Sequence, residues 1–247
     1  MNVALLVKDK IDGYKEREPI FIKGLNIPYE YNNARDCALN KLEKKNIIKQ
    51  YRRGIYYKPK TTPFGEIGID KEKVIIRQYI ETANKERMGY ITGPTLWYNL
   101  DLTTQIPNRK WIVTNNISRN IEDKELKIKL IKTKEKITNE NYDYFKVIDI
   151  IDQIEQIQDL DTSKLKIFIE NELSELRTDQ LEELLRIATK YKKSTVRTLG
   201  AVIEVVTRQN YNNNTIINKL KEEYSYGKKN KVKNLLNLNN IREWGLY

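Results

Sequence analysis

The sequence predicts an α+β fold, in which an N-terminal winged helix-turn-helix is followed by a mixed α+β domain with a helical C-terminal part. The first 60 residues show the order helix, helix, turn, helix and β-hairpin, which is the order of a winged helix-turn-helix. Two strand-like runs and three amphipathic helical patterns follow. A chain of 247 residues with 39 % hydrophobic residues is large enough to bury a core, in one large domain or in two smaller ones.

Three helices are predicted in the N-terminal segment. The first covers residues 3–14. The second begins with Pro19 at its first helical position, where the missing N–H of proline costs no hydrogen bond. The third runs to about Lys45, and either Asn32 or Asn33 can cap its N-terminus.

A β-hairpin and a linker close this segment. β-branched and aromatic residues at 47–51 and 55–57 flank Arg52-Arg53-Gly54, which indicates a hairpin. The run Thr61-Thr62-Pro63-Phe64-Gly65 has the composition of a short linker. The predicted domains are therefore 1–62, a winged helix, and 63–205, an α+β domain, with a basic helical extension at 206–247.

The second domain is predicted to begin with a long helix over residues 71–85. Thr92 or Gly93 can cap a short helix that has Pro94 in its first turn. Residues 111–114 and 126–131 are predicted strands, and the second alternates apolar residues with lysine, as a half-exposed strand does. Three helical patterns follow, with apolar faces within residues 165–176, 181–191 and 196–206.

The composition excludes many chemistries. The sequence has no histidine and one cysteine, which removes Ser-His-Asp and Cys-His catalysis and nearly all zinc sites. We expect no enzyme activity, no cofactor and no metal. The longest apolar run, Val3 to Val7, is only five residues long, so we expect neither a membrane span nor a signal peptide, and a cytoplasmic protein.

The positive charge is concentrated at the two ends of the chain. The formal net charge is +11, from 45 basic and 34 acidic side chains. Residues 1–60 carry 14 basic and 7 acidic side chains, residues 61–205 carry 23 and 24, and residues 206–247 carry 8 and 3. Because a compositional bias would spread evenly, this distribution favours a polyanionic partner, with nucleic acid first.

The third predicted helix is the best candidate for DNA recognition. In the major groove, Asn pairs with adenine and Arg with guanine, whereas lysines suit phosphates. The candidate base-contacting residues are Asn32, Asn33, Arg35, Asp36 and Asn40. The candidate phosphate and wing contacts are Lys41, Lys44, Arg52 and Arg53. The alternative is a winged helix that binds only proteins.

An acidic segment lies in the second domain. Residues 149–183 contain 11 acidic and 3 basic side chains. Asp149, Asp152, Glu155 and Asp159 recur at helical spacing, which predicts one exposed acidic stripe. Such a row could bind Mg²⁺ for phosphodiester cleavage, which would make the protein a DNA nuclease. A solvated helix face and a docking surface for a basic protein are the two other interpretations.

Three segments resemble one known family. The first runs from Ala38 to Ile48 and continues through Arg53-Gly54-Ile55-Tyr56-Tyr57. The second comprises Gly89-Tyr90-Ile91-Thr92-Gly93-Pro94-Thr95, then Leu102 to Pro107, then Ile112 to Asn115. The third is Val196-Arg197-Thr198-Leu199-Gly200-Ala201-Val202-Ile203-Glu204. Spaced in this way, they are similar to the AbiEi-type antitoxins of bacterial type IV toxin–antitoxin systems, which act in abortive infection, a form of phage defence.

The resemblance implies a function with two parts. It implies a transcriptional repressor that binds operator DNA, with inverted repeats expected, and so regulates its own operon. It also implies a second domain that counteracts a cognate nucleotidyltransferase-type toxin, against whose basic surface the acidic stripe could dock. The charge and the helix pattern support only the first part.

Overall fold

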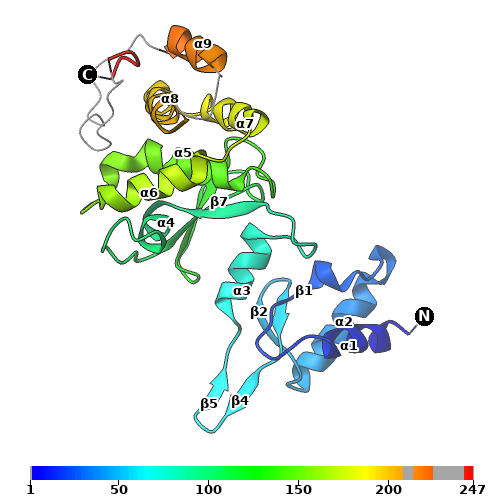
Figure 1. The fold of residues 1–247 in the computed structure, drawn as a ribbon. Helices are drawn as coiled ribbons and strands as arrows, with labels where there is room; N and C mark the ends of the chain where they lie inside the picture. Colours follow the sequence, from blue (N-terminus) through cyan, green and yellow to red (C-terminus); the bar gives the residue numbers. More distant parts are fainter. Residues whose placement is uncertain (1, 208–213, 225–241, 247) are drawn as a thin grey trace. The chain divides into compact units, whose positions relative to one another are not determined.

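The computed structural model describes residues 2–207, 214–224 and 242–246 and has a mixed α+β architecture, as predicted (Figure 1). The chain divides into two compact units, Met1–Gln78 and Tyr79–Tyr247, each with a hydrophobic core of its own. The division falls after α3 (Lys71–Ile75), so the segment that follows residue 62 belongs to the first unit. Most of the basic extension expected at 206–247 lies outside the described residues.

The first unit combines two helices with a small antiparallel sheet. The helices are α1 (Val3–Asp12) and α2 (Asn32–Lys44), and two 3-10 turns, Ile22–Leu25 and Tyr29–Tyr31, lie between them. The sheet has the strand order β1-β3-β2, made by Ile20–Phe21, Ile55–Tyr57 and Lys49–Arg52. The predicted first and third helices and the predicted hairpin are therefore present.

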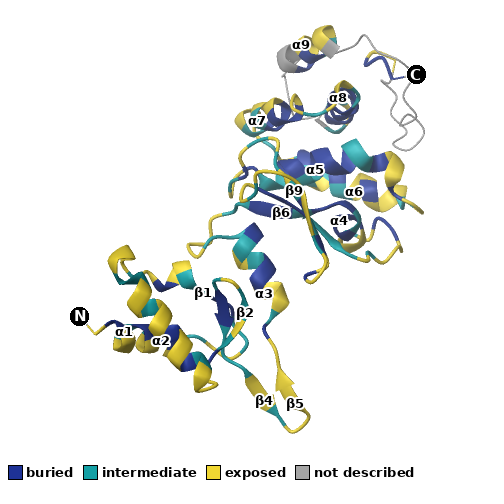
Figure 2. Ribbon diagram, turned by 180° about the vertical axis from the view of Figure 1, so that it is seen from behind, coloured by how far each residue is buried: buried dark blue, intermediate teal, exposed yellow. Residues whose placement is uncertain are grey.

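The core of this unit explains why these elements pack together. Val7 and Ile11 of α1, Leu39 of α2, and Ile20 and Ile48 are almost completely buried. In both helices the buried residues recur at helical spacing, so each helix turns one apolar side towards the other helix and the shared core and leaves its opposite side exposed (Figure 2).

The predicted second helix is wrong. Ile20 and Phe21 form strand β1, paired with Tyr56 and Ile55 of β3. A β-branched and an aromatic residue favour this pairing, and Ile20 is thereby fully buried. The predicted asparagine cap of the third helix is also wrong, because α2 begins at Asn32 and its N-cap, Tyr31, makes no side-chain cap bond.

The predicted linker and the long helix after it differ as well. Strands β4 (Lys60–Thr62) and β5 (Gly65–Ile67) form a hairpin where the linker was expected. Helix α3 continues as one π-helical turn, Ile76–Ile80, and stops there. A tight turn follows, in which Lys85 has a φ of 62° and its N–H donates to the carbonyl of Thr82 at 3.0 Å.

The second unit is built on a four-stranded mixed sheet. Its order is β6-β7-β9-β8, with β7 and β9 parallel and the other pairs antiparallel. The strands are Gly89–Thr92, Lys110–Thr114, Ile128–Lys132 and Ile121–Asp123, in that order. The predictions of β7 and β9 are confirmed, whereas β6 and β8 were not predicted.

Helices cover this sheet in successive layers (Figure 1). Helix α5 (Tyr142–Gln153) packs on β6, α7 and α8 pack on α5, and α9 packs on α8. The bounds of the remaining helices are Gly93–Asn99 for α4, Thr162–Leu173 for α6, Thr178–Ala188 for α7, Lys193–Thr207 for α8 and Asn214–Tyr224 for α9. The three predicted apolar faces are confirmed, since Leu165, Leu184 and Leu199 are fully buried.

None of the helices in the described ranges combines the length and the apolar character that a bilayer span requires.

Candidate nucleic-acid interface

The outer face of α2 brings several predicted DNA contacts together. Asn33, Asp36, Asn40, Lys41 and Lys44 are all exposed. Asn33, Asp36, Asn40 and Lys44 recur every three or four residues, so they lie along one side of the helix, and Lys41 follows Asn40 at the edge of that side. The opposite side holds the buried residues that fix the helix to the core. The face therefore presents the amide of Asn33 near its N-terminal end, and the amide of Asn40 beside Lys41 and Lys44 towards its C-terminal end.

Asn32 and Arg35 are not freely presented. Nη1 of Arg35 donates to Oδ1 of Asn32 at 2.6 Å, and its Nε donates to Oδ1 of Asp36 at 2.9 Å. The Arg35 side chain is only 15 % exposed. These contacts hold the guanidinium along the helix, whereas Asn33 and Asn40, two of the other candidate base-contacting residues, are exposed.

The β2–β3 hairpin presents one exposed arginine. Arg53 and Gly54 form its turn, and Gly54 has a φ of 80°, which favours glycine. The carbonyl of Gly54 accepts a hydrogen bond from the N–H of Ile22 at 3.0 Å, which holds the turn against the start of the 3-10 helix. Arg53 is exposed, whereas Arg52 is half-buried over the ring of Tyr51, 5.1 Å from its centroid.

The segment from the end of α2 to the end of the second hairpin is strongly basic. Residues 44–69 contain seven lysines and arginines and one acidic residue, Glu66. Glu66 forms an ion pair with Lys49, with Nζ and Oε2 2.6 Å apart. Because the single negative charge is paired, the segment is complementary to a polyanion.

The acidic stripe predicted in the second unit is wrong. Asp149 is 6 % exposed and lies inside the unit. Its Oδ2 accepts hydrogen bonds from Tyr90 Oη at 2.8 Å and Thr92 Oγ1 at 2.6 Å, and its Oδ1 accepts one from Tyr191 Oη at 2.8 Å. Burial raises the pKa of the Asp149 carboxyl, and the three hydroxyl donors act in the opposite direction.

The other three carboxylates do not form one row: Asp152 and Glu155 line one small pocket, and Asp159 is not among its lining residues. Asp152 accepts from Thr195 Oγ1 at 2.5 Å, and its side chain is only 12 % exposed. Glu155 lies on a separate 3-10 turn, because α5 ends at Gln153. Asp159 has a φ of 51° and accepts from Gln105 Nε2 at 3.0 Å. The helical spacing thus breaks at the end of α5.

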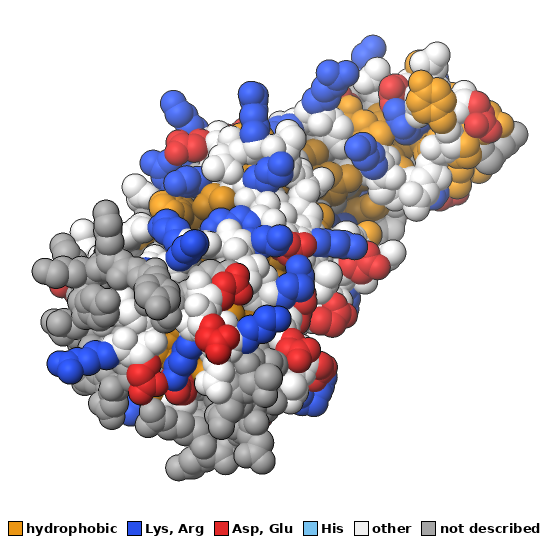
Figure 3. Space-filling model, turned by 90° about the horizontal axis from the view of Figure 1, so that it is seen from above, with side chains coloured by type: hydrophobic (Ala, Val, Ile, Leu, Met, Phe, Trp, Pro, Cys, Tyr) orange, Lys and Arg blue, Asp and Glu red, His pale blue; other side chains and the backbone are white. Residues whose placement is uncertain are grey.

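The surface of the second unit carries both charges, and Oδ1 of Asp152 itself lies 3.7 Å from Nζ of Lys192. On the face of the second unit shown in Figure 3, acidic and basic side chains are interspersed. Within the described parts of the chain, no group of three or more His, Cys, Asp or Glu side chains is arranged to hold a metal ion.

The motif around residues 89–95 has a structural role in this unit. A Cβ on Gly89 would lie 2.1 Å from the carbonyl oxygen of Tyr79, and one on Gly93, whose φ is 60°, would lie 2.6 Å from the Trp111 ring. Two other residues of the motif, Tyr90 and Thr92, donate to Asp149. The motif therefore closes β6 against its neighbours and satisfies the buried carboxylate.

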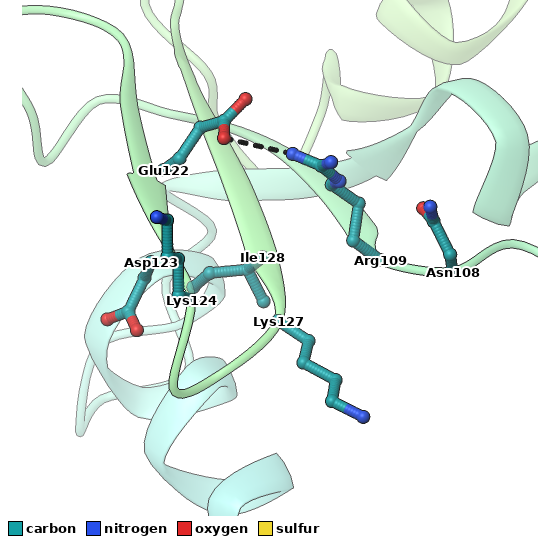
Figure 4. Close-up of a pocket in the computed structure, with 7 residues that line it drawn as sticks. All are labelled: Asn108, Arg109, Glu122, Asp123, Lys124, Lys127 and Ile128. Atoms are coloured by element: carbon teal, nitrogen blue, oxygen red, sulfur yellow. Dashed lines mark ion pairs between the residues drawn. The ribbon is translucent and has the colours of Figure 1, made fainter.

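A surface pocket of about 370 Å³ lies beside the β8–β9 turn (Figure 4). Its lining residues are Asn108, Arg109, Glu122, Asp123, Lys124, Lys127 and Ile128. The Arg109 and Glu122 side chains meet in an ion pair of 3.0 Å, whereas Lys127 points away from that pair. Because Glu122 already pairs with Arg109, the pocket offers less free positive charge to a polyanion than the first unit does. We therefore place the candidate site on the first unit.

Two exposed aromatic residues of the first unit were not predicted as functional. Tyr29 is 87 % exposed just before α2, and Phe64 is 100 % exposed between β4 and β5. Phe64 could have been found, because threonines before Pro63 and Ile67 after Gly65 indicate a hairpin with an aromatic residue at its turn. Tyr29 has no comparable signal in the sequence.

Comparisons with known proteins identify the family but no activity. The search among curated proteins found no match. Among solved structures, the chain is similar to the RV2827C protein from Mycobacterium tuberculosis, with 11 % identity and a TM-score of 0.41, over 83 % of this chain and 75 % of that chain. The family model described as "Family of unknown function (DUF6088)" matches residues 7–190. The protein therefore belongs to the DUF6088 family.

Proposed function

We propose that the first unit is a winged helix that binds operator DNA and that the protein represses its own operon. The element order supports this proposal, since α1, β1, two short 3-10 turns, α2 and the β2–β3 hairpin follow one another much as in winged helices, with β1 added to the hairpin sheet. In this arrangement α2 is the helix that enters the major groove.

One observation carries the proposal: the exposed amide face of α2 is continuous in sequence with the basic segment 44–69. Amides can pair with base edges, and the basic side chains supply the phosphate contacts that fix the register. We assign Asn33 and Asn40 to bases and Lys41, Lys44 and Arg53 to phosphates. An operator of two inverted repeats would engage two copies of the chain.

A reporter assay tests the proposal. The DNA upstream of the protein's own reading frame is fused to a reporter gene, and the protein is supplied from a second plasmid. We expect wild type to lower expression and the double variant Asn33→Ala, Asn40→Ala to restore it. Leu5→Ala is the control, because Leu5 is 56 % exposed on α1. Equal repression by the double variant, at equal protein levels, would remove α2 from DNA recognition.

We also propose that the second unit counteracts a nucleotidyltransferase-type toxin. Support comes from the resemblance to AbiEi-type antitoxins, two of whose three segments lie in this unit. Co-expression with the product of the neighbouring reading frame provides the test. If that product is the toxin, the Asn33→Ala, Asn40→Ala variant should still restore growth when expressed from an independent promoter. Loss of protection together with loss of repression would show that neutralisation depends on DNA binding.

A further inference from the structure

The β4–β5 hairpin exposes an apolar tip. Phe64 is fully exposed, and Ile67 at the end of β5 is 38 % exposed. Nearly every residue of both strands is exposed as well (Figure 2). The hairpin forms a two-stranded sheet separate from β1-β3-β2, so no packing in the first unit accounts for the phenylalanine.

The tip has a defined shape. Thr62 pairs with Gly65, which leaves Pro63 and Phe64 alone at the turn. The hydroxyl of Thr62 donates to the carbonyl of Gly65 at 2.7 Å, and Gly65 has a φ of 112°, which favours glycine. Proline restricts the backbone just before Phe64, so the ring is presented on a constrained turn.

The base of the hairpin is fixed by Arg17. Its N–H donates to the carbonyl of Lys58 at 2.8 Å, and its Nε donates to the carbonyl of Gly68 at 3.1 Å. Its own carbonyl accepts from the N–H of Asp70 at 2.9 Å. One residue thus holds the chain on both sides of the hairpin, which makes it an arm with an anchored base.

The charge of the neighbouring residues indicates which partner the tip contacts. The arm lies at the end of the basic segment 44–69, which contains seven basic side chains and one acidic side chain. That residue, Glu66, lies on the arm itself and is paired with Lys49 at 2.6 Å. Such a surface is complementary to the phosphates on either side of a DNA groove.

We propose that the β4–β5 arm enters the minor groove of duplex DNA and inserts Phe64 between two base pairs. Apolar wedges of this kind unstack one base step and kink the duplex by roughly 20–90°. The inference rests on the proposed DNA-binding function and adds a second contact to it. Pro63 and Phe64 form the wedge, and the exposed Lys60 on β4 contacts a phosphate.

The test measures affinity and bending with the full chain. The probe is duplex DNA from upstream of the reading frame, with a fluorescent donor and acceptor at its ends. Wild type should bind and increase energy transfer, because a kink brings the ends together. Phe64→Ala should bind about tenfold more weakly and lose the increase. Phe64→Leu should keep part of the bend, since it keeps an apolar wedge, and Leu5→Ala should behave as wild type.

The outcomes separate the two proposals. If wild type binds no better than an unrelated protein of equal charge, the DNA-binding function itself fails. If wild type binds and Phe64→Ala binds and bends DNA equally well, the arm is not a wedge and the DNA-binding function stands. If Phe64→Ala keeps both DNA binding and bending but loses protection against the toxin, the tip contacts a protein, and the wedge is overturned.

Discussion

Gly200, in the segment Val196 to Glu204 that resembles the antitoxin family, has a packing role. It lies within α8, and a Cβ at this position would lie 2.2 Å from Cη2 of Trp244. Trp244 is completely buried, and its indole N–H donates to Oε2 of Glu204 at 2.8 Å. Glycine therefore lets the indole approach the backbone of α8 and holds residues 242–246 against that helix.

Gly200→Ala should lower the free energy of unfolding by about 1–3 kcal/mol, because overpacking a core costs this much. Helix propensity alone predicts the opposite, a gain of about 1 kcal/mol. Urea unfolding followed by circular dichroism measures the difference. Adding Trp244→Ala should remove the clash, so the double variant should lose less than the sum of the single losses. A stabilised Gly200→Ala variant would show that the indole does not pack there.

The buried Asp149 should make the stability of the protein depend on pH. Because burial raises its pKa in the folded protein, the folded state binds a proton more tightly than the unfolded state does. Its contribution to stability therefore rises as pH falls through the raised pKa towards the ordinary value of 3.8. Asn at this position cannot titrate.

The free energy of unfolding of wild type minus that of Asp149→Asn should thus increase as pH falls in this range, by at most about 1.4 kcal/mol per pH unit. Urea titrations at several pH values measure it, and taking the difference cancels the other carboxyl groups. A difference that stays constant or grows with rising pH would contradict the raised pKa.

At the scale of elements, the β2–β3 hairpin should contribute nonspecific affinity. Arg53→Ala combined with Arg52→Ala should weaken binding to every DNA sequence. It should also reduce the slope of log affinity against log salt concentration by about one for each lost phosphate contact. Arg53→Ala alone should account for most of the change, because Arg52 is half-buried over Tyr51. Fluorescence anisotropy at four salt concentrations provides the slope, and an unchanged slope would place the hairpin away from DNA.

The periodicity of apolar residues predicted the elements whose conformation follows from their own sequence. The apolar faces of α6, α7 and α8 and the alternation in β9 are visible along the sequence and are confirmed. Strand β1 was missed because its two residues extend only when Ile55 and Tyr56 pair with them, and those partners lie more than thirty positions away. The β4–β5 hairpin was missed because Pro63 and Gly65 are also typical of a linker.

For the whole molecule, the candidate site was partly predictable. The exposed face of α2 follows from helical spacing alone, and the basic segment follows from counting charges. The burial of Asp149 does not, since its partners Tyr90 and Tyr191 lie 59 and 42 residues away. Helical spacing places a carboxylate on one side of its own helix, and only the packing of α5 against β6 shows that this side is covered.

The central claim is that α2 gives the protein a preference for one DNA sequence. The most direct measurement is the ratio of its affinities for the DNA upstream of its own reading frame and for a scrambled duplex of equal length, at one physiological salt concentration. We predict a ratio of roughly 10³ or more for wild type. Asn33→Ala and Asn40→Ala should each weaken binding to the upstream duplex by about 1–3 kcal/mol and leave binding to the scrambled duplex nearly unchanged, which lowers the ratio. A ratio near one for wild type would contradict the claim, because charge alone would then account for all the binding.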